Sequence, residues 1–495
     1  MKFQQQVNNL VNQINRCGNP FDEKCQELLV LNTRECAAEN VVTSECTIEE
    51  VGKRQFETFK REVLEERTKP ISTAIKRNSL PLFSTTKHKV RSSTYKIKAI
   101  KNDVGLFSRL YISTQQHEGD LDEFFAHENH AYPPSISNFG KLRLGDKSDL
   151  LKMLQDTGTK PDDCRFECKI FDGGALIHFL SPKNATLLFS EYSHQIFLPF
   201  LERELSTVKR VDVVWDRYLT DSLKNCTREK RGPGVRVKVG PQARVPKNWN
   251  AFLRDSTNKD ELFNYLSEEV DHVQWDCSRE IYITKGSLVI AKGGGKPMFD
   301  CTHEEADTRV IVHLLHALEN GQSRVEIRTV DTDVVVLLIG KFFDVQAKYP
   351  LVDIWVAFGV GKHFQYIHVN SVCGKLGKDQ SESFPAFHAF SGCDTTSSFC
   401  GKGKKSALQT WRSFPEATEA FLHMQQNPFV AVNYSSPHFK TLERLTVLMY
   451  DKRSTFHSVN AARRELFSKK GRTIEKIPPT QVTTVVGYRW FPSAF

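Results

Sequence analysis

The sequence lacks the features that would place it in several large protein classes. Its longest strongly apolar run is Val334–Ile339, which is far short of the roughly 20 residues that cross a bilayer. The N-terminus has no apolar core of the kind a signal peptide needs, and no cysteine pair has CxxC spacing. We therefore expect an intracellular chain with no membrane segment, whose 12 cysteines are reduced thiols rather than a disulfide framework.

Two familiar catalytic motifs are also missing. No Gly-x-Ser-x-Gly sequence indicates the nucleophile of an α/β-hydrolase, and no Gly-x4-Gly-Lys-[Ser/Thr] sequence indicates a P-loop. Two histidines near the acidic residues discussed below, His303 and His388, are more typical of surface or core positions than of a catalytic base. Residues other than a serine nucleophile, a P-loop or a histidine base are therefore the candidates for any catalytic role.

What the chain does contain is enough apolar material for a large core. Hydrophobic residues make up 39% of its 495 residues, and Phe is abundant (34) while Met is scarce (5), so the core should be rich in aromatic rings. The length suggests about three domains. The net charge of +9 permits nucleic-acid binding without establishing it.

The pattern of the sequence divides the chain into three parts. Residues 1–165 are expected to form a mixed, mostly helical region of unknown role, and residues 413–495 a helical extension. Between them, residues 166–412 alternate short apolar runs with helical segments, which is typical of an α/β fold with a mainly parallel, twisted sheet and flanking helices. The expected strands include Phe166–Phe171, Val211–Trp215, Arg324–Val330, Val352–Phe358 and a hairpin at Ile281–Ala291.

Carboxylates follow several of these strands at their carboxyl ends. Asp172 and Asp216 close the first two strands, Asp331 and Asp333 follow a later one, and Asp394 lies in a Gly-containing turn. The carboxyl edge of an open α/β sheet is where ligands bind. Each acid alone also has a purely structural interpretation as a turn residue or helix N-cap.

A further acidic group, Glu304, Glu305 and Asp307, opens the helix expected at 302–318. Thr302 and Glu305 fit a capping box, with Thr302 as N-cap and Glu305 at the third helical position. That structural role does not exclude a second one.

Gathered at one edge, these carboxylates would repel one another unless divalent cations neutralised them. Carboxylates suit Mg²⁺ and Mn²⁺, and two such ions about 4 Å apart serve phosphodiester hydrolysis. Replacing Asp333 by Asn should therefore keep the fold and slightly raise the stability of the metal-free protein. The candidate metal ligands are Asp172, Asp216, Glu304, Glu305, Asp307, Asp331, Asp333 and Asp394, and the candidate catalytic residues are the same set without Glu304.

The order of these residues resembles the metal-dependent 5′-nuclease superfamily with a PIN-like fold, which includes flap endonucleases, XPG and the Asteroid proteins. The resemblance covers about residues 166–412 and implies a two-metal nuclease acting on DNA flaps, forks or single-strand ends. Two segments, residues 303–309 and 391–397, are also similar to a widespread set of uncharacterised animal proteins, some of mobile-element origin. The short motifs that carry the resemblance are, in order, Phe171-Asp172, Val213-Val214-Trp215-Asp216, Glu305-Ala306-Asp307, Asp331-Thr332-Asp333, and Gly392-Cys393-Asp394 with Gly401-Lys402-Gly403-Lys404.

A basic segment lies within the insertion 217–300, between the motifs that end at Asp216 and begin at Glu305. In the resembled nucleases the corresponding segment is an arch that gates single-stranded DNA, and Tyr218 and Trp249 flank it here as rings that can stack on bases. The alternatives are a solvated basic loop or a nuclear-import signal. This segment contains one acid, Glu229, and eight cationic residues: Lys224, Arg228, Lys230, Arg231, Arg236, Lys238, Arg244 and Lys247.

A second candidate phosphate contact follows Asp394. Glycines bring the backbone close to a phosphate, and a helix N-terminus with lysines adds favourable charge. The alternative is a flexible start of the helix expected from about Ser406. The residues concerned are Gly401, Lys402, Gly403, Lys404 and Lys405.

The sequence thus predicts a Mg²⁺- or Mn²⁺-dependent, structure-specific nuclease. A non-catalytic nucleic-acid-binding protein of the same fold and a protein-interaction scaffold remain as alternatives. The expected partner is nucleic acid, with DNA favoured over RNA, no membrane is expected as partner, and the nucleus is favoured over the cytoplasm.

Overall fold

The computed structural model describes residues 4–8, 11, 28, 36–37, 39–73, 120–128, 132–138, 140–145, 147–154, 165–182, 187–218, 234–428, 433–468 and 476–488. Two compact units divide the chain. The first comprises Met1–Thr94, Pro182–Ile196 and Pro233–Tyr265, and the second comprises Tyr95–Ser181, Phe197–Gly232 and Leu266–Phe495.

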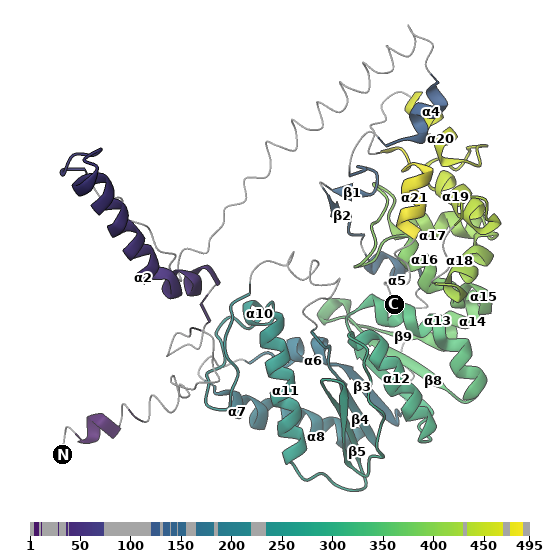
Figure 1. Cartoon of the computed structure of the whole chain (residues 1–495). Helices are drawn as coiled ribbons and strands as arrows, with labels where there is room; N and C mark the ends of the chain where they lie inside the picture. The colour runs from purple at the N-terminus through teal and green to yellow at the C-terminus, as the bar shows by residue number, and fades with distance from the viewer. Residues whose placement is uncertain are drawn as a thin grey trace. The chain divides into compact units, whose positions relative to one another are not determined.

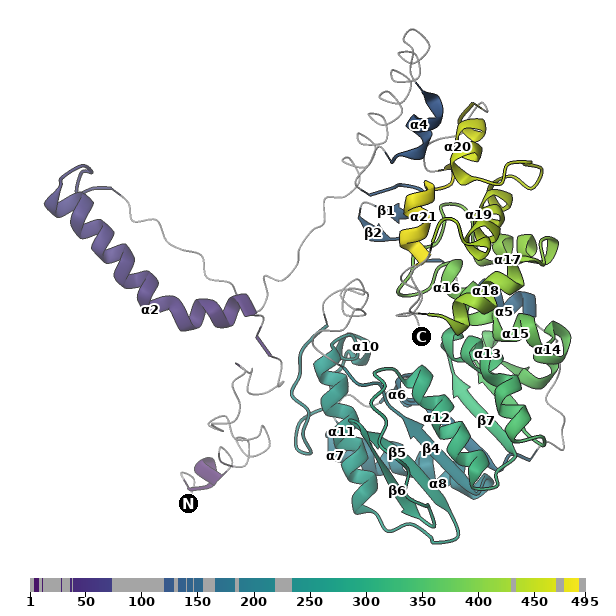
Figure 2. The same cartoon turned by 45° about the vertical axis from the view of Figure 1, so that its right-hand side comes forward.

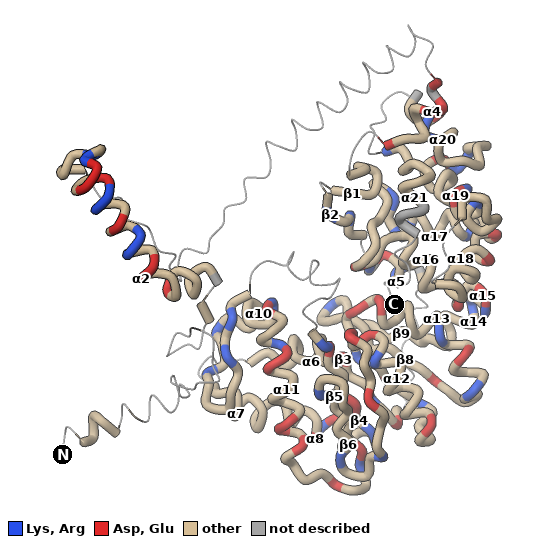
Figure 3. Tube along the Cα trace, in the orientation of Figure 1, with Lys and Arg blue, Asp and Glu red and all other residues tan. Residues whose placement is uncertain are grey.

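The first unit is helical in its described parts. Its longest element is α2 (Glu39–Phe59), which continues into the π-helical turn η1 (Lys60–Glu65), and Figure 3 shows acidic and basic residues alternating along α2. The short helices α7 (Phe189–Tyr192) and α10 (Trp249–Phe252) meet through aromatic rings, with the Tyr192 and Trp249 centroids 5.4 Å apart. The long helix α11 (Ser256–His272) begins in this unit.

The second unit contains a seven-stranded sheet in the order β6-β5-β4-β3-β7-β8-β9, seen in Figures 1 and 2. Five central strands run parallel, and an antiparallel strand closes each edge. The expected α/β fold with a mainly parallel sheet is thereby confirmed. The strands are β3 (Cys168–Asp172), β4 (Arg210–Val214), β5 (Glu280–Lys285), β6 (Leu288–Gly293), β7 (Arg324–Thr329), β8 (Asp353–Phe358) and β9 (Gln365–His368).

The strand order has one reversal, and it lies at β3. The chain moves from β3 outward to β4 and β5, then returns to place β7 on the other side of β3. Ligands of open α/β sheets bind outside the carboxyl ends of the strands at such a point. Functional residues are therefore expected at the ends of β3 and β7.

Helices connect and cover the parallel strands. Helix α6 (Gly173–Phe179) contacts β3 and β7, α8 (Leu198–Thr207) contacts β4, and α12 (Ala306–Glu319) contacts β3, β4 and α13 (Thr332–Lys348). The sequence showed α13 only as an apolar run, because every residue from Thr332 to Gly340 is buried. A helix buried on all sides lacks the periodicity that reveals an amphipathic helix.

Several of the remaining helices of the second unit share the core of the sheet. One buried apolar cluster joins Ile170 in the sheet to Leu150 in α5, Leu442 in α19 and Ile477 near the C-terminus. No helix among the described residues has the length and apolar character to cross a membrane. The elements before the sheet are α4 (Leu121–Ala126), β1 (Ser137–Asn138), β2 (Lys141–Leu142) and α5 (Ser148–Leu154), and those after it are α14 (Val369–Leu376), α15 (Lys378–Glu382), α16 (Phe384–Phe390), α17 (Lys404–Ser413), α18 (Ala417–Gln426), α19 (Pro437–Tyr450), α20 (Val459–Ser468) and α21 (Gln481–Tyr488).

Candidate metal centre

The carboxyl ends of β3 and β7 are joined through one hydroxyl group. Thr329 donates its Oγ1 proton to Asp172 Oδ2 at 2.7 Å and accepts the backbone N–H of Asp331 at 3.0 Å. Asp172 Oδ1 accepts the N–H of Ala175 at 3.2 Å and so caps α6. These bonds fix Asp172, which is buried, and place it beside the loop that carries Asp331.

Asp216 reaches the same place from the end of β4. A methyl group built on Gly174 would lie 3.3 Å from Asp172 Oδ1 and 3.9 Å from Asp216 Oδ2, so both carboxylates face that point. Asp216 Oδ1 also accepts the N–H of Ala306 at 2.8 Å, and Tyr218 donates its hydroxyl to Oδ2 at 3.2 Å. Two acids from adjacent strands are thereby held close together.

The prediction of a capping box at Thr302 and Glu305 is wrong. Helix α12 begins at Ala306 with Glu305 as its N-cap, and the Glu305 side chain makes no capping bond. The first N–H of the helix is satisfied instead by Asp216, which comes from β4. Glu304 lies in the bend before the helix, where its carbonyl accepts the N–H of Arg217 at 2.7 Å.

Three acids from the N-termini of α12 and α13 offer a possible metal site. Asp307, Asp331 and Asp333 each present one ligand atom, and these atoms all lie within 4.8 Å of one another. Hard carboxylate oxygens without sulfur or imidazole donors suit Mg²⁺ or Mn²⁺. The residues present therefore fit the ions expected from the sequence.

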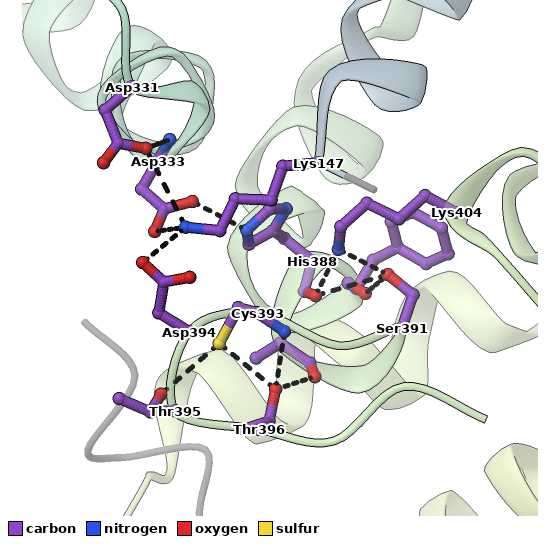
Figure 4. Close-up of polar contacts among 12 residues, drawn as sticks. Lys147, Asp331, Asp333, His388, Ser391, Cys393, Asp394, Thr395, Thr396 and Lys404 are labelled. Carbon is purple, nitrogen blue, oxygen red and sulfur yellow. Dashed lines mark hydrogen bonds and ion pairs between the residues drawn. The ribbon is translucent and has the colours of Figure 1, made fainter. Parts of the chain in front are cut away.

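Asp333 is bound on both of its oxygens (Figure 4). Lys147 Nζ lies 2.7 Å from Asp333 Oδ2, and the buried His388 bonds Asp333 Oδ1 through Nε2 at 2.9 Å. The same lysine nitrogen lies 2.9 Å from Asp394 Oδ2 and 3.9 Å from Asp331 Oδ1. One ammonium group thus joins acids from the start of α13 and from the turn at 392–394.

The electrostatic environment differs from one carboxyl group to the next. Burial, reinforced by Asp216, raises the pKa of Asp172 to about 7. Burial and the neighbouring Asp333 also raise the pKa of Asp331. Burial would raise the pKa of Asp333 as well, but His388 and Lys147 outweigh it and hold the pKa well below the usual range. Asp333 is therefore the stabilised anion of the group.

The two bases around Asp333 are in different protonation states. Burial acts to lower the pKa of Lys147, but the carboxylates of Asp331, Asp333 and Asp394 overcome it and raise that pKa. Burial and the nearby Lys404 lower the pKa of His388 to about 4. His388 is accordingly neutral at pH 7, and its Nε2–H donates to the carboxylate.

The turn that carries Asp394 depends on a glycine and a buried lysine. Gly392 has a φ of +101°, and a methyl group there would lie 2.6 Å from Ser398 Cβ. Lys404 is 1% exposed and donates Nζ–H to the His388 carbonyl at 2.8 Å and to Ser391 Oγ at 3.0 Å. Burial lowers the pKa of Lys404 to about 7.

These contacts correct the expected phosphate-binding role of Lys404. Its amine points into the protein and fastens α17 to the turn, so it is not presented to a ligand at the surface. Gly401, Gly403 and Lys405 are exposed and Lys402 is half-buried, and their binding role stays a prediction.

The basic segment is only partly described. Lys224, Arg228, Lys230 and Arg231 lie outside the described residues. In the first unit, Glu261 already pairs with Arg236 at 2.6 Å and with Lys238 at 3.1 Å, while Arg244 and Lys247 are exposed. The expected stacking role of Trp249 is wrong, because its ring is buried against Tyr192 and Phe252.

Three further residues contribute to the centre: Lys147, His388 and Thr329. No role was expected for Lys147 or Thr329, whereas His388 was expected at a surface or core position and is fully buried. Lys147 lies in residues 1–165, the region of unknown role, and its partner Asp333 is 186 residues away in the sequence. No local pattern could have joined them. For Thr329, a hydroxyl at the end of an apolar strand just before Asp331 was a usable signal.

Comparison with known proteins adds little to this geometry. No protein-family model matches the chain, and a search of curated proteins gives no match. Among solved structures, the T5 D15 protein co-crystallized with metal ions is similar, with a TM-score of 0.29 and 15% identity over 66% of this chain and 93% of that chain. At that TM-score the likeness carries no argument about fold or function.

Proposed function

We propose that the protein is a metal-dependent nuclease of the PIN-like 5′-nuclease type, which hydrolyses phosphodiester bonds of DNA. The observation that carries the proposal is the meeting of Asp307, Asp331 and Asp333 within 4.8 Å. They meet at the carboxyl edge of a parallel sheet, where the reversal of strand order lies and where ligands of such sheets bind. Asp172 and Asp216 lie at the ends of the adjoining strands.

The residues are suited to hold two ions side by side. Asp307, Asp331 and Asp333 would bind one ion, and Asp172 and Asp216 would take part in binding the second. Bound Mg²⁺ or Mn²⁺ would supply an activated water and stabilise negative charge on the phosphate. The protein's own part is to hold the ligands rigidly: Thr329 and the Ala175 N–H orient Asp172, and the Ala306 N–H orients Asp216.

The choice of nucleic acid as substrate rests on charge. The segment 224–247 carries eight cations and one acid. Arg236 and Lys238 pair with Glu261, and the six other cations give the segment a positive charge that favours a phosphate backbone. Flaps, forks and single-strand ends are the proposed substrates because the segment occupies the sequence position of the arch in the resembled nucleases. The alternative functions, a nucleic-acid-binding protein without chemistry and a scaffold, share this fold.

The test compares the wild type with Asp331→Asn on labelled flap, fork and single-strand DNA. Asn keeps the N-cap of α13 but removes one anionic ligand. Cleavage should fall by at least about 100-fold, since even groups that only support a metal ligand contribute 10–100-fold. Asp344→Asn is the matched control, because Asp344 lies on the same helix, is exposed, and pairs with Lys341.

Wild type and Asp344→Asn should cleave in Mg²⁺ or Mn²⁺ and remain inactive in Ca²⁺, which prefers longer bonds and looser geometry. Equal cleavage by wild type and Asp331→Asn would indicate a contaminating nuclease. DNA binding by the wild type without cleavage of any substrate would favour the non-catalytic alternative.

A further inference from the structure

Lys147 stands where a cation would neutralise the acids of the metal centre. Its ammonium nitrogen contacts Asp333 and Asp394 at 2.7 and 2.9 Å, and Asp331 lies 3.9 Å away. Its side chain is 19% exposed. Exposed ion pairs contribute little, but this lysine is largely enclosed and shared among carboxylates from separate elements.

Hydrogen bonds fasten the segment before Lys147, at Ser135 and Arg143, to residues 397–400, which follow Asp394. The Arg143 N–H donates to Ser397 Oγ at 2.8 Å, the Ser398 N–H donates to the Arg143 carbonyl at 2.8 Å, and the Cys400 N–H donates to the Ser135 carbonyl at 2.7 Å. On the other side of Lys147, Leu150 in α5 is fully buried in the core. The position of this lysine is therefore built into the fold.

Of the two groups on Asp333, only the lysine has room to leave. His388 is fully buried in α16, so its bond to Asp333 Oδ1 is fixed. Lys147 extends from a turn on four flexible methylene groups, and its ammonium can swing to solvent while its backbone stays in place. Asp333 Oδ2 is thus the oxygen that can exchange an ammonium for another cation.

We propose that Lys147 is a built-in cation that competes with a divalent ion for Asp333 and its neighbours. Without metal, the ammonium balances part of the charge of Asp331, Asp333 and Asp394. A divalent ion must displace it to coordinate Asp333 Oδ2. The lysine therefore sets the metal concentration at which the centre fills, an inference that rests on the proposed function because it assumes a metal centre.

The experiment measures Mn²⁺ binding by the electron paramagnetic resonance signal of free Mn²⁺, which requires no catalytic activity. Lys147→Met should bind Mn²⁺ at least about tenfold more tightly than wild type, because a unit positive charge a few ångströms from the ion is removed. Lys152→Met is the matched control: Lys152 lies on α5, is exposed, and pairs with Asp149 at 2.9 Å. It should bind Mn²⁺ as the wild type does.

Each result decides the matter. Tighter binding by Lys147→Met alone supports the competition. Equal or weaker binding by Lys147→Met overturns it and leaves the metal centre standing, whereas no binding by any variant overturns the metal centre as well. If the Met variant does not fold, Lys147→Gln gives the same comparison, since it keeps N–H donors toward Asp333 and Asp394 without the charge.

Discussion

Strand β4 and its end carry two aspartates with opposite surroundings. Asp212, inside the strand, accepts both of its Arg210 bonds at 2.7 Å and a third from His313 Nδ1 at 2.7 Å, and all three side chains are fully buried. Asp216, beyond the end of the strand, faces another carboxylate, Asp172, across Gly174. Burial would raise the pKa of Asp212, but Arg210 and His313 lower it.

The difference separates an acid whose charge is matched inside the fold from acids that are candidate metal ligands. At Asp212 the charge is matched inside the protein, and Arg210 also stacks 3.9 Å from the ring centroid of Tyr282. At the carboxyl edge, Lys147 is shared by three carboxylates, and Asp172 and Asp331 have raised pKa values. An imbalance of this kind is what a bound cation would correct.

The largest expected effect comes from breaking the balanced side of the comparison. Asp212→Ala should lower the free energy of unfolding by about 3–5 kcal/mol, because it leaves the buried guanidinium of Arg210 unpaired. Urea unfolding followed by circular dichroism measures the change. The double variant Arg210→Met/Asp212→Leu should recover most of the loss, since an apolar pair of similar size can replace a buried ion pair. An equal loss of unfolding free energy in the single and the double variant would show that the unpaired guanidinium of Arg210 is not the cause.

Asp172 and Asp212 should affect stability with pH in opposite directions. The folded pKa of Asp172 is about 7, above its unfolded value of about 3.9. Between these values the folded state holds the extra proton, so stability of the metal-free protein should fall as pH rises, by up to about 1.4 kcal/mol per unit. Asp212 has a lowered pKa, so its contribution is present above the unfolded value and is lost as pH falls.

The measurement is urea unfolding in EDTA from pH 4 to pH 8, for wild type and Asp172→Asn. The variant should lose the decline that Asp172 causes between about pH 4 and 7. Identical slopes in the two proteins would show that Asp172 is ionised throughout this range.

The smallest effects concern the two acids at the start of α13, Asp331 and Asp333, which should respond with opposite signs. Asp331→Asn should raise the stability of the metal-free protein, because it removes the repulsion between Asp331 and Asp333. The gain should be only about a few tenths of a kcal/mol, because the Asp331 side chain is 37% exposed and solvent screens its charge. Asp333→Asn should lower it by about 1–3 kcal/mol, since two bonds to a carboxylate are disrupted. Thermal unfolding in EDTA tests the pair, and a stabilised Asp333→Asn would mean that Lys147 and His388 do not hold this anion.

This last expectation reverses the one drawn from sequence, and the reason shows what sequence could provide. Apolar runs and strand-end acids predicted the parallel sheet and the acids that lie along its carboxyl edge. They could not reveal which acid is paired, because His388 and Lys147 lie 55 and 186 residues from Asp333. Nor did they reveal Arg210 and Asp212, although two charged residues at alternate positions of one apolar strand face the same side.

The bonds that hold Lys147 in place also bear on how the chain acquires its centre. The Arg143 N–H and Ser397 Oγ are 254 residues apart, and contacts of such separation are costly to close and form slowly. During synthesis, at about 5–20 residues per second, every strand of the sheet emerges before residue 397. We therefore expect a nascent sheet with its acids already in line but no lysine between them, so that arrival of the 397–400 turn, rather than assembly of the sheet, times the completion of the centre.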